Sequence, residues 1–218
     1  MKCCACGLKK GKRHCPAKEE SICSQCCGQK RVIEIDCPES CEYLKQGQER
    51  DAGEFNKMLR GMDAVALERS KRVLTGSADL LMRLEYALAR QRVISRAVVD
   101  RDVAQAVDIL TATYKTEENG ILYENTSDDM RVESVRRELR GIIESLRNPR
   151  KGRREGIVDP ASDTGDERLT PAAAIECLEF MKSVIAFFQK ERDSATAYVD
   201  YLARYYPREK SKGSIIIP

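Results

Sequence analysis

A dense cluster of thiols at the start of the chain constrains the fold more than any other feature. Nine of the ten cysteines, together with the single histidine, lie between Cys3 and Cys41. This segment holds few apolar residues, so it cannot bury a core large enough to fold alone. Bound metal would have to supply the missing stability, because closed thiolate sites contribute folding free energy directly.

Two Cys-x2-Cys pairs in this segment have the spacing of a metal knuckle, in which two thiolates face one ion. A glycine follows each pair closely, and a positive φ at that glycine would close the turn. The pairs with their glycines are Cys3 and Cys6 with Gly7, and Cys23 and Cys26 with Gly28. This pattern predicts zinc bound by cysteine.

Eight of the cysteines suffice for two tetrahedral Cys4 zinc sites, since one zinc ion takes four ligands. The first predicted site consists of Cys3, Cys6, Cys23 and Cys26. The second consists of Cys15, Cys27, Cys37 and Cys41. The neighbours Cys26 and Cys27 would serve different ions, which interleaves the two sites in a cross-brace. Cys4 and His14 are spare in this scheme, although His14 could replace Cys15.

Three other arrangements of the thiols remain open. A single Cys4 zinc would leave the other thiols idle, and an iron–sulfur cluster is an alternative although the spacings fit neither common ferredoxin pattern. A disulfide-bonded secreted module is the third, but the sequence starts without an apolar signal segment. No apolar run approaches the roughly 20 residues of a membrane span. We therefore expect a cytoplasmic chain with reduced, metal-bound thiols and no membrane contact.

Helical periodicity dominates the remainder of the chain, in which charged residues are frequent and tryptophan is absent. The last helix should run from Thr170 to Pro207 without a break. Cys177 lies on its apolar face and is expected to be a small core residue. Further helix boundaries are expected at Gly76–Ser77, Asn119–Gly120 and Ser127–Asp129.

These patterns together predict a mainly α protein with two parts. Residues 1–44 should form a small treble-clef or cross-brace zinc module, and residues 45–218 a bundle of about five to six helices. Within the module, Arg31–Asp36 alternates like a short strand that leads into Cys37. The charged stretch 148–169 should be a flexible loop, and the apolar tail after Ser214 should dock on the bundle or on a partner.

Catalysis finds little support in the sequence. All-cysteine zinc sites are closed and structural, whereas a catalytic zinc keeps one position open. With a single histidine the chain cannot build an HExxH helix, and it lacks both the Walker phosphate loop and the GxGxxG pattern. We therefore expect a protein that is not an enzyme.

Basic residues surround the predicted zinc ligands. Residues 1–41 hold eight Lys and Arg against five Asp and Glu, a net charge of +3 that equals the net charge of the whole chain. A rigid finger with such a face is suited to phosphate backbones. The candidate contacts are Lys9, Lys10, Lys12, Arg13, Lys18, Lys30 and Arg31.

The sequence leaves several binding roles open beside RNA or DNA. The basic residues could merely solubilise the module, because no aromatic residue precedes Tyr43 to stack on a base. The helical part, close to charge balance, is expected to dock protein and could form a homo-oligomer. The alternatives are a protein–protein adaptor and a redox switch whose zinc thiolates are oxidised.

One set of motifs resembles a known family. The run Ile22-Cys23-x2-Cys26-Cys27-Gly28-x2-Arg31, followed by Ile35-x-Cys37-Pro38-x2-Cys41-x-Tyr43-Leu44, is similar to the N-terminal module of an uncharacterised family of bacterial cysteine-rich proteins. The stretch Gly120-Ile121-Leu122-Tyr123-Glu124 is similar to the helical part of that family. The resemblance implies a zinc-binding protein of the bacterial cytoplasm and brings no activity, substrate or partner.

Overall fold

The computed structural model describes residues 1–148 and 169–206, and these residues form a mainly α-helical protein. A two-stranded antiparallel sheet and one short helix come first, and longer helices follow. The elements are β1 (Arg13–Cys15), β2 (Glu20–Ile22), α1 (Ser24–Lys30), α2 (Glu42–Arg60), α3 (Ala64–Gly76), α4 (Ala78–Ser95), α5 (Asp100–Glu118), α6 (Met130–Arg147), α7 (Pro171–Glu191) and α8 (Ala197–Tyr205).

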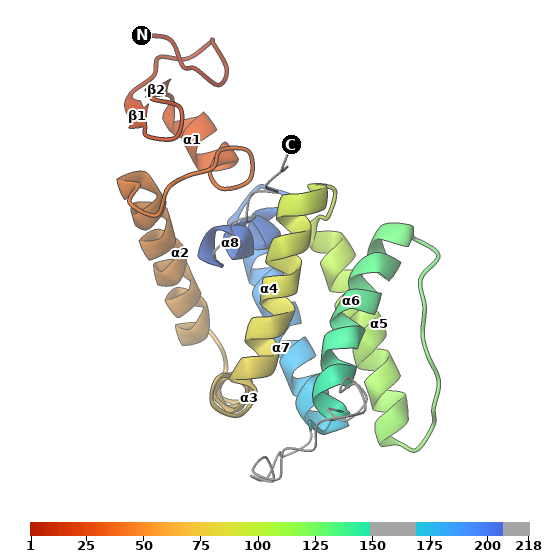
Figure 1. The fold of residues 1–218 in the computed structure, drawn as a ribbon. Helices are drawn as coiled ribbons and strands as arrows, with labels where there is room; N and C mark the ends of the chain where they lie inside the picture. The colour runs from red at the N-terminus through yellow and green to blue at the C-terminus, as the bar shows by residue number, and fades with distance from the viewer. Residues whose placement is uncertain (149–168, 207–218) are drawn as a thin grey trace, which may run out of the picture.

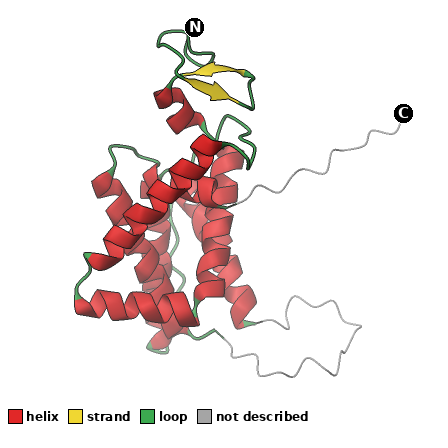
Figure 2. Ribbon diagram, turned by 90° about the vertical axis from the view of Figure 1, so that its left-hand side faces the viewer, coloured by secondary structure: helices red, strands yellow, loops and turns green. Residues whose placement is uncertain are grey.

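The helical domain is a bundle in which α5 packs on both α6 and α7, while α4 packs on α6 and α8 (Figure 1). Helix α3 runs across one end of the bundle and contacts α7 and α4 (Figure 2). One continuous core fills the bundle and includes Leu84, Leu110, Leu139 and Phe188, each fully buried. These apolar residues recur at helical spacing, which is why the sequence pattern identified most of the helices.

The cysteine-rich segment lies at the other end of the bundle from α3 (Figure 1). Its buried residues form two small clusters that are separate from the core of the bundle. The first cluster is built largely from cysteines around Ile22 and Ile35, and the second contains Val32, Cys41 and Leu44. With so few apolar side chains, this segment depends on its thiols for stability.

Helix α2 connects the two parts, because it starts at the last cysteine of the cluster and continues beside the bundle (Figure 1). Asp51 on α2 is 2% exposed and accepts hydrogen bonds from Arg192 at 2.6 Å and from Arg204 at 3.1 Å. Burial would raise the pKa of Asp51, but the charges of these arginines outweigh it and the pKa lies below its usual value. The predicted boundary at residues 44 and 45 falls inside the first turns of α2.

The helix count of the bundle differs from the expected five or six, since seven helices, α2 to α8, lie within its described residues, and α1 adds an eighth in the metal module. The predicted long helix after Thr170 is interrupted at Arg192, whose backbone is extended and whose guanidinium turns toward Asp51. Helix α8 then starts anew, because the carboxylate of Asp100 accepts hydrogen bonds from its first backbone N–H groups, those of Tyr198 and Val199. Tertiary contacts therefore override the helical periodicity there.

The predicted strand at Arg31–Asp36 is wrong. The backbone N–H groups of Glu34 and Ile35 both donate to the carbonyl of Lys30, and Val32 adopts a positive φ of 65°. These residues therefore form a turn after α1, and the strands of the module lie earlier, at β1 and β2. The predicted loop at 148–169 and the tail after Ser214 lie almost entirely outside the described residues.

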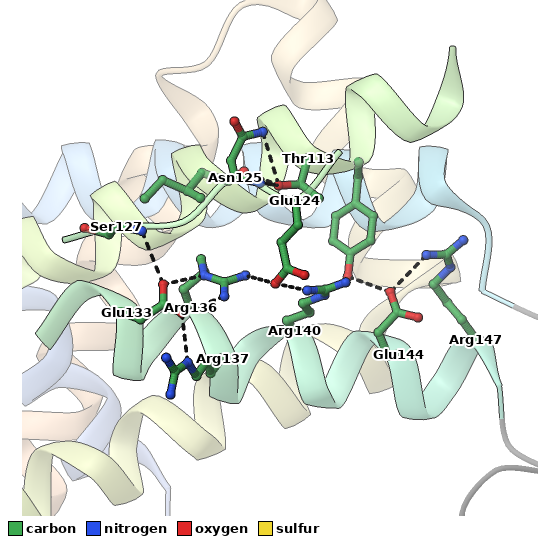
Figure 3. A network of polar contacts seen from close by, with 12 residues as sticks. Thr113, Glu124, Asn125, Ser127, Glu133, Arg136, Arg137, Arg140, Glu144 and Arg147 are labelled. Carbon is green, nitrogen blue, oxygen red and sulfur yellow. Dashed lines mark hydrogen bonds and ion pairs between the residues drawn. The ribbon is translucent and has the colours of Figure 1, made fainter. Parts of the chain in front are cut away.

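The connector between α5 and α6 is held in place by a polar network (Figure 3). Arg136, 2% exposed, donates to Glu133 at 2.7 Å and to Glu124 of the connector at 2.9 Å. The backbone N–H of Asn125 donates to Thr113 at 3.2 Å. Hydrogen bonds from Arg136 lower the pKa of Glu133 to about 2, which keeps this carboxylate charged. The connector is thus fixed by charge pairs rather than by apolar burial.

None of the helices in residues 1–148 and 169–206 combines the length and the apolar content that a membrane crossing requires.

A partly buried carboxylate makes the stability of the bundle depend on pH. Glu85 on α4 accepts hydrogen bonds from Tyr206 at 2.8 Å and from Tyr198 at 3.2 Å. Burial raises its pKa from 4.5 to about 7, although both hydroxyls oppose this shift. Between these two pH values the folded protein keeps a proton that the unfolded chain has released. Stability contributed by Glu85 is therefore lost as the pH rises through that window.

We predict that the free energy of unfolding falls by about 2–3 kcal/mol between about pH 5 and pH 8 because of Glu85 alone. A Glu85→Gln variant, which keeps an acceptor for both tyrosines, should lack this part of the slope. Urea unfolding followed by helical circular dichroism at both pH values measures the difference. Equal slopes in the two proteins would contradict the assignment to Glu85.

Candidate metal centre

The first knuckle is a tight turn at the N-terminus. The backbone N–H of Gly7 donates to the carbonyl of Cys3 at 2.8 Å, and Gly7 adopts a φ of 65°. The N–H of Cys3 in turn donates to the carbonyl of Lys9 at 2.8 Å. Because a positive φ suits glycine best, the expected role of Gly7 is confirmed. The turn leaves Cys3 buried and Cys6 partly exposed.

The second Cys-x2-Cys pair lies at the beginning of α1. Cys23 is the N-cap residue, and its sulfur accepts a hydrogen bond from the backbone N–H of Cys26 at 3.4 Å. Gly28 therefore sits inside the helix, and the expected positive φ at this glycine is wrong. A separate knuckle turn is not needed here, because the first turn of α1 places the sulfurs of Cys23 and Cys26 on the same side of the helix.

The four thiols of the first predicted site converge. The sulfurs of Cys3, Cys6, Cys23 and Cys26 all lie within 4.8 Å of one another. A tetrahedral zinc ion with Zn–S bonds of about 2.3 Å holds its sulfurs roughly 3.8 Å apart, so a small contraction would complete the site. The donor set, four thiols with most of their surface buried, fits a closed metal site.

Hydrogen bonds within the cluster prepare it for metal. The backbone N–H of Cys23 donates to the sulfur of Cys3 at 3.2 Å and lowers the pKa of this thiol to about 6. Cys26 donates to the sulfur of Cys23 and is buried, which raises the pKa of Cys26 to about 12. Metal binds thiolates, so metal binding would displace the protons that the cluster retains.

The thiols of the second predicted site lie near one another on three elements. Cys15 ends β1, Cys27 lies in α1 and Cys41 caps α2, and all three are buried. Cys37 packs on both small clusters of the module. Burial raises the pKa of Cys37, and the charges of Cys41, Cys15 and Cys27 raise it further.

Among the histidine, cysteine and acidic side chains of the described residues, one group of possible ligand atoms lies within 4.8 Å of one another, and it is the first predicted site. The second site stays a prediction. Of the residues spare in the two-site scheme, Cys4 is exposed in the first turn and His14 is exposed on β1. Cys177 is fully buried in the core of the bundle, as expected.

Arg31 proves to be a structural residue beside the second thiol group. It is 8% exposed, and its guanidinium donates to the carbonyl of Cys27 at 3.1 Å and to the carbonyl of Tyr43. A Cβ atom at Gly47 on α2 would clash with this guanidinium, so the close approach requires glycine. A glycine in the middle of a helix is the one sequence signal that could have pointed to this contact.

The other basic candidates lie on the outside of the module. Lys9, Lys10, Lys12 and Lys18 are exposed, whereas Arg13 and Lys30 are half-buried. The guanidinium of Arg13 lies over the ring of Tyr43, 4.7 Å from its centroid, and Lys30 forms an ion pair with Glu34 at 2.6 Å. Four exposed lysines therefore lie on the surface of the module.

Comparison of the chain with protein-family models, with curated proteins and with solved structures gives no significant match. The resemblance to bacterial cysteine-rich proteins thus stays a prediction that depends on the motifs alone. The structure itself supports a coarser description, a cysteine-rich and mainly helical chain whose N-terminal thiols converge as a metal site would require.

Proposed function

We propose that this chain is a non-enzymatic zinc protein whose basic metal module contacts nucleic acid and whose helical domain docks protein. The observation that carries the proposal is the convergence of Cys3, Cys6, Cys23 and Cys26 within 4.8 Å. Four thiolates occupy every position of a tetrahedral zinc ion and leave none for a substrate. The metal then has a structural role, and function lies in the surfaces that it holds in place.

The order of elements supports a treble-clef arrangement for the first zinc. A knuckle supplies two ligands, the β1–β2 hairpin follows, and the first turn of α1 supplies the other two. A second zinc bound by Cys15, Cys27, Cys37 and Cys41 would join the hairpin to α1 and to the start of α2. The neighbouring residues Cys26 and Cys27 would then form the expected cross-brace.

We predict two zinc ions per chain in protein purified without added metal, measured by elemental analysis. Cys6→Ser should reduce the content to about one ion, and Cys41→Ser should do the same, because each removes one of four ligands from a different site. Cys4→Ser is the matched control and should keep both ions. A stoichiometry near one in the unmodified protein would contradict the second site, and visible absorbance would indicate an iron–sulfur cluster.

Zinc should be required by the module and dispensable for the bundle. The two parts have separate apolar clusters, and zinc binding in finger peptides is worth roughly 10–16 kcal/mol. We predict that chelation increases hydrogen exchange in residues 1–41 while most of the far-ultraviolet helix signal survives. Complete loss of helicity after chelation would show instead that both parts unfold together.

Exposed lysines support the nucleic-acid part of the proposal. Lys9, Lys10, Lys12 and Lys18 all lie on the module, where zinc would fix the backbone that carries them. Ammonium groups on a rigid surface contact phosphates without reading sequence, so binding of RNA or DNA backbone is the expected mode. Arg31 is excluded from this surface because it is buried.

We predict that the protein binds labelled RNA or DNA and that affinity falls with salt by about 0.9 log units per phosphate contact per decade for duplex DNA. A Lys9/Lys10/Lys12/Lys18→Ala variant should lose affinity and should show a shallower salt slope, by about one unit per contact removed. Fluorescence anisotropy at two salt concentrations measures both effects.

The control replaces four exposed basic residues of the helical domain by alanine, which changes the net charge equally. Suitable positions are Arg60, Lys71, Arg83 and Arg137. This variant should bind as the unmodified protein does. Absence of binding at low salt, or equal losses in both variants, would leave the protein-adaptor alternative as the better account.

The connector between α5 and α6 supports docking of protein by the helical domain. Ile121, Leu122 and Tyr123 are 60%, 89% and 63% exposed, although the network of Arg136 and Glu124 fixes the chain beside them (Figure 3). Apolar side chains exposed on an ordered segment are a common feature of protein-binding surfaces. A redox switch remains the second alternative, and the rate of zinc release under mild peroxide would test it.

A further inference from the structure

A cleft lies between the metal module and the helical domain. It is open to solvent, has a volume of about 250 Å³, and is bounded by α1 on one side, and by α2, the α7–α8 turn and α8 on the other. Four arginines line it, Arg31, Arg50, Arg192 and Arg204, against a single acidic residue, Asp200.

The carboxylates near the cleft do not balance its arginines. Arg192, Arg204 and the more distant Arg50 share Asp51 and Glu54. Asp200 is paired with a further arginine, Arg92, at 2.7 Å. With Arg31 included, five guanidinium groups meet three carboxylates, which leaves two positive charges without a carboxylate.

Arg31 and Arg50 carry this excess. The guanidinium of Arg31 donates to two backbone carbonyls, and its Nη2 lies 3.9 Å from the sulfur of Cys27. If Cys27 bound metal as a thiolate, its negative charge would offset the charge of Arg31. One positive charge without a negative partner would then remain in the cleft. Arg50 is 68% exposed and approaches Asp51 and Glu54 only at 3.5 and 3.8 Å, so it is free to turn toward a ligand.

Neutral donors complete the lining. Gln25 and Gln29 of α1 face the cleft, and the side-chain oxygen of Gln25 accepts a hydrogen bond from Lys9. This bond leaves the amide N–H groups of Gln25 available as donors. Guanidinium and amide donors around a net positive charge suit an anion with several acceptor oxygens.

We propose that this cleft binds a phosphate group that contacts the metal module and the helical domain at the same time. A phosphate monoester carries about −1.5 to −2 charges at pH 7 and offers three acceptor oxygens to these guanidinium and amide donors, whereas a carboxylate offers two. The free ion and the terminal phosphate of a nucleotide share this chemistry.

The proposal is independent of backbone binding by the exposed lysines. The cleft uses side chains of α1, α2 and α8, whereas the exposed lysines lie in the first loop and the hairpin, and Lys9 alone among them contacts a lining residue of the cleft, Gln25. A protein that binds nucleic acid without binding inorganic phosphate would contradict the cleft alone. A protein that binds phosphate without binding RNA or DNA would contradict backbone binding by the lysines alone.

Isothermal titration of inorganic phosphate into the zinc-loaded, full-length protein, at an ionic strength fixed with chloride, tests the proposal. Binding should saturate, and Arg50→Ala should weaken it by roughly tenfold, since charge-assisted contacts to phosphate are lost. Arg50→Lys should recover part of the loss, because lysine keeps the charge but lacks the planar fork. Arg50 is exposed, so its replacement leaves the fold intact.

The matched control is Arg83→Ala. Arg83 is 53% exposed on α4 and pairs with a carboxylate one helical turn away, as Arg50 does on α2, but it lies outside the cleft. Its replacement should leave phosphate binding unchanged. Absence of saturable binding at millimolar phosphate, or equal effects of the two alanine variants, would overturn the proposal.

A nucleoside 5′-monophosphate, titrated in the same way, distinguishes the two sources of the phosphate. Tighter binding than that of inorganic phosphate would indicate a nucleotide or the end of a nucleic acid, and equal binding would indicate the free ion. In both cases the Arg50→Ala variant must bind more weakly for the site to be the cleft.

Discussion

A buried carboxylate on α2 holds the metal module and the helical bundle in one arrangement. Asp51 is 2% exposed, and its partners Arg192 and Arg204 come from the end of α7 and from α8. The side chain of Gln48, one turn earlier, adds a hydrogen bond to the carbonyl of Arg204 at 2.9 Å. Because a buried charge without its partner is costly, α2 is fixed against α8, and Cys41 at the N-terminus of α2 is fixed with it.

The two parts are stabilised in different ways. The bundle buries large apolar side chains at helical spacing, whereas the module buries mainly thiols and a few branched residues such as Ile22 and Ile35. Metal bonds in place of an apolar core would allow about forty residues to keep a defined shape. It also frees most of the module's surface from burial, which is how its lysines remain exposed.

Sequence patterns predicted those features that depend on local chemistry. The helix start at Thr170 and Pro171, the break at Gly76 and Ser77 and the positive φ at Gly7 follow from capping and turn preferences, and each is confirmed. The break at Arg192 was missed, because it depends on Asp51, which is more than a hundred residues away in the sequence. The turn at Arg31–Asp36 was missed because an alternating sequence pattern does not distinguish a strand from a turn in which one carbonyl, that of Lys30, accepts two backbone hydrogen bonds.

The spacing of the cysteines predicted which four thiols form the first site, but it did not predict that Arg31 is buried beside Cys27. Arg31 reads as one more surface cation in the sequence, yet it is buried between Cys27 and Gly47 of α2. If zinc occupied the second predicted site, its four thiolates would give that site a net charge of −2. Arg31 would offset part of that charge, and its hydrogen bonds to the carbonyls of Cys27 and Tyr43 connect α1 to α2. Zinc would therefore act mechanically in this protein, by fixing the wall of the cleft that α1 and Arg31 provide.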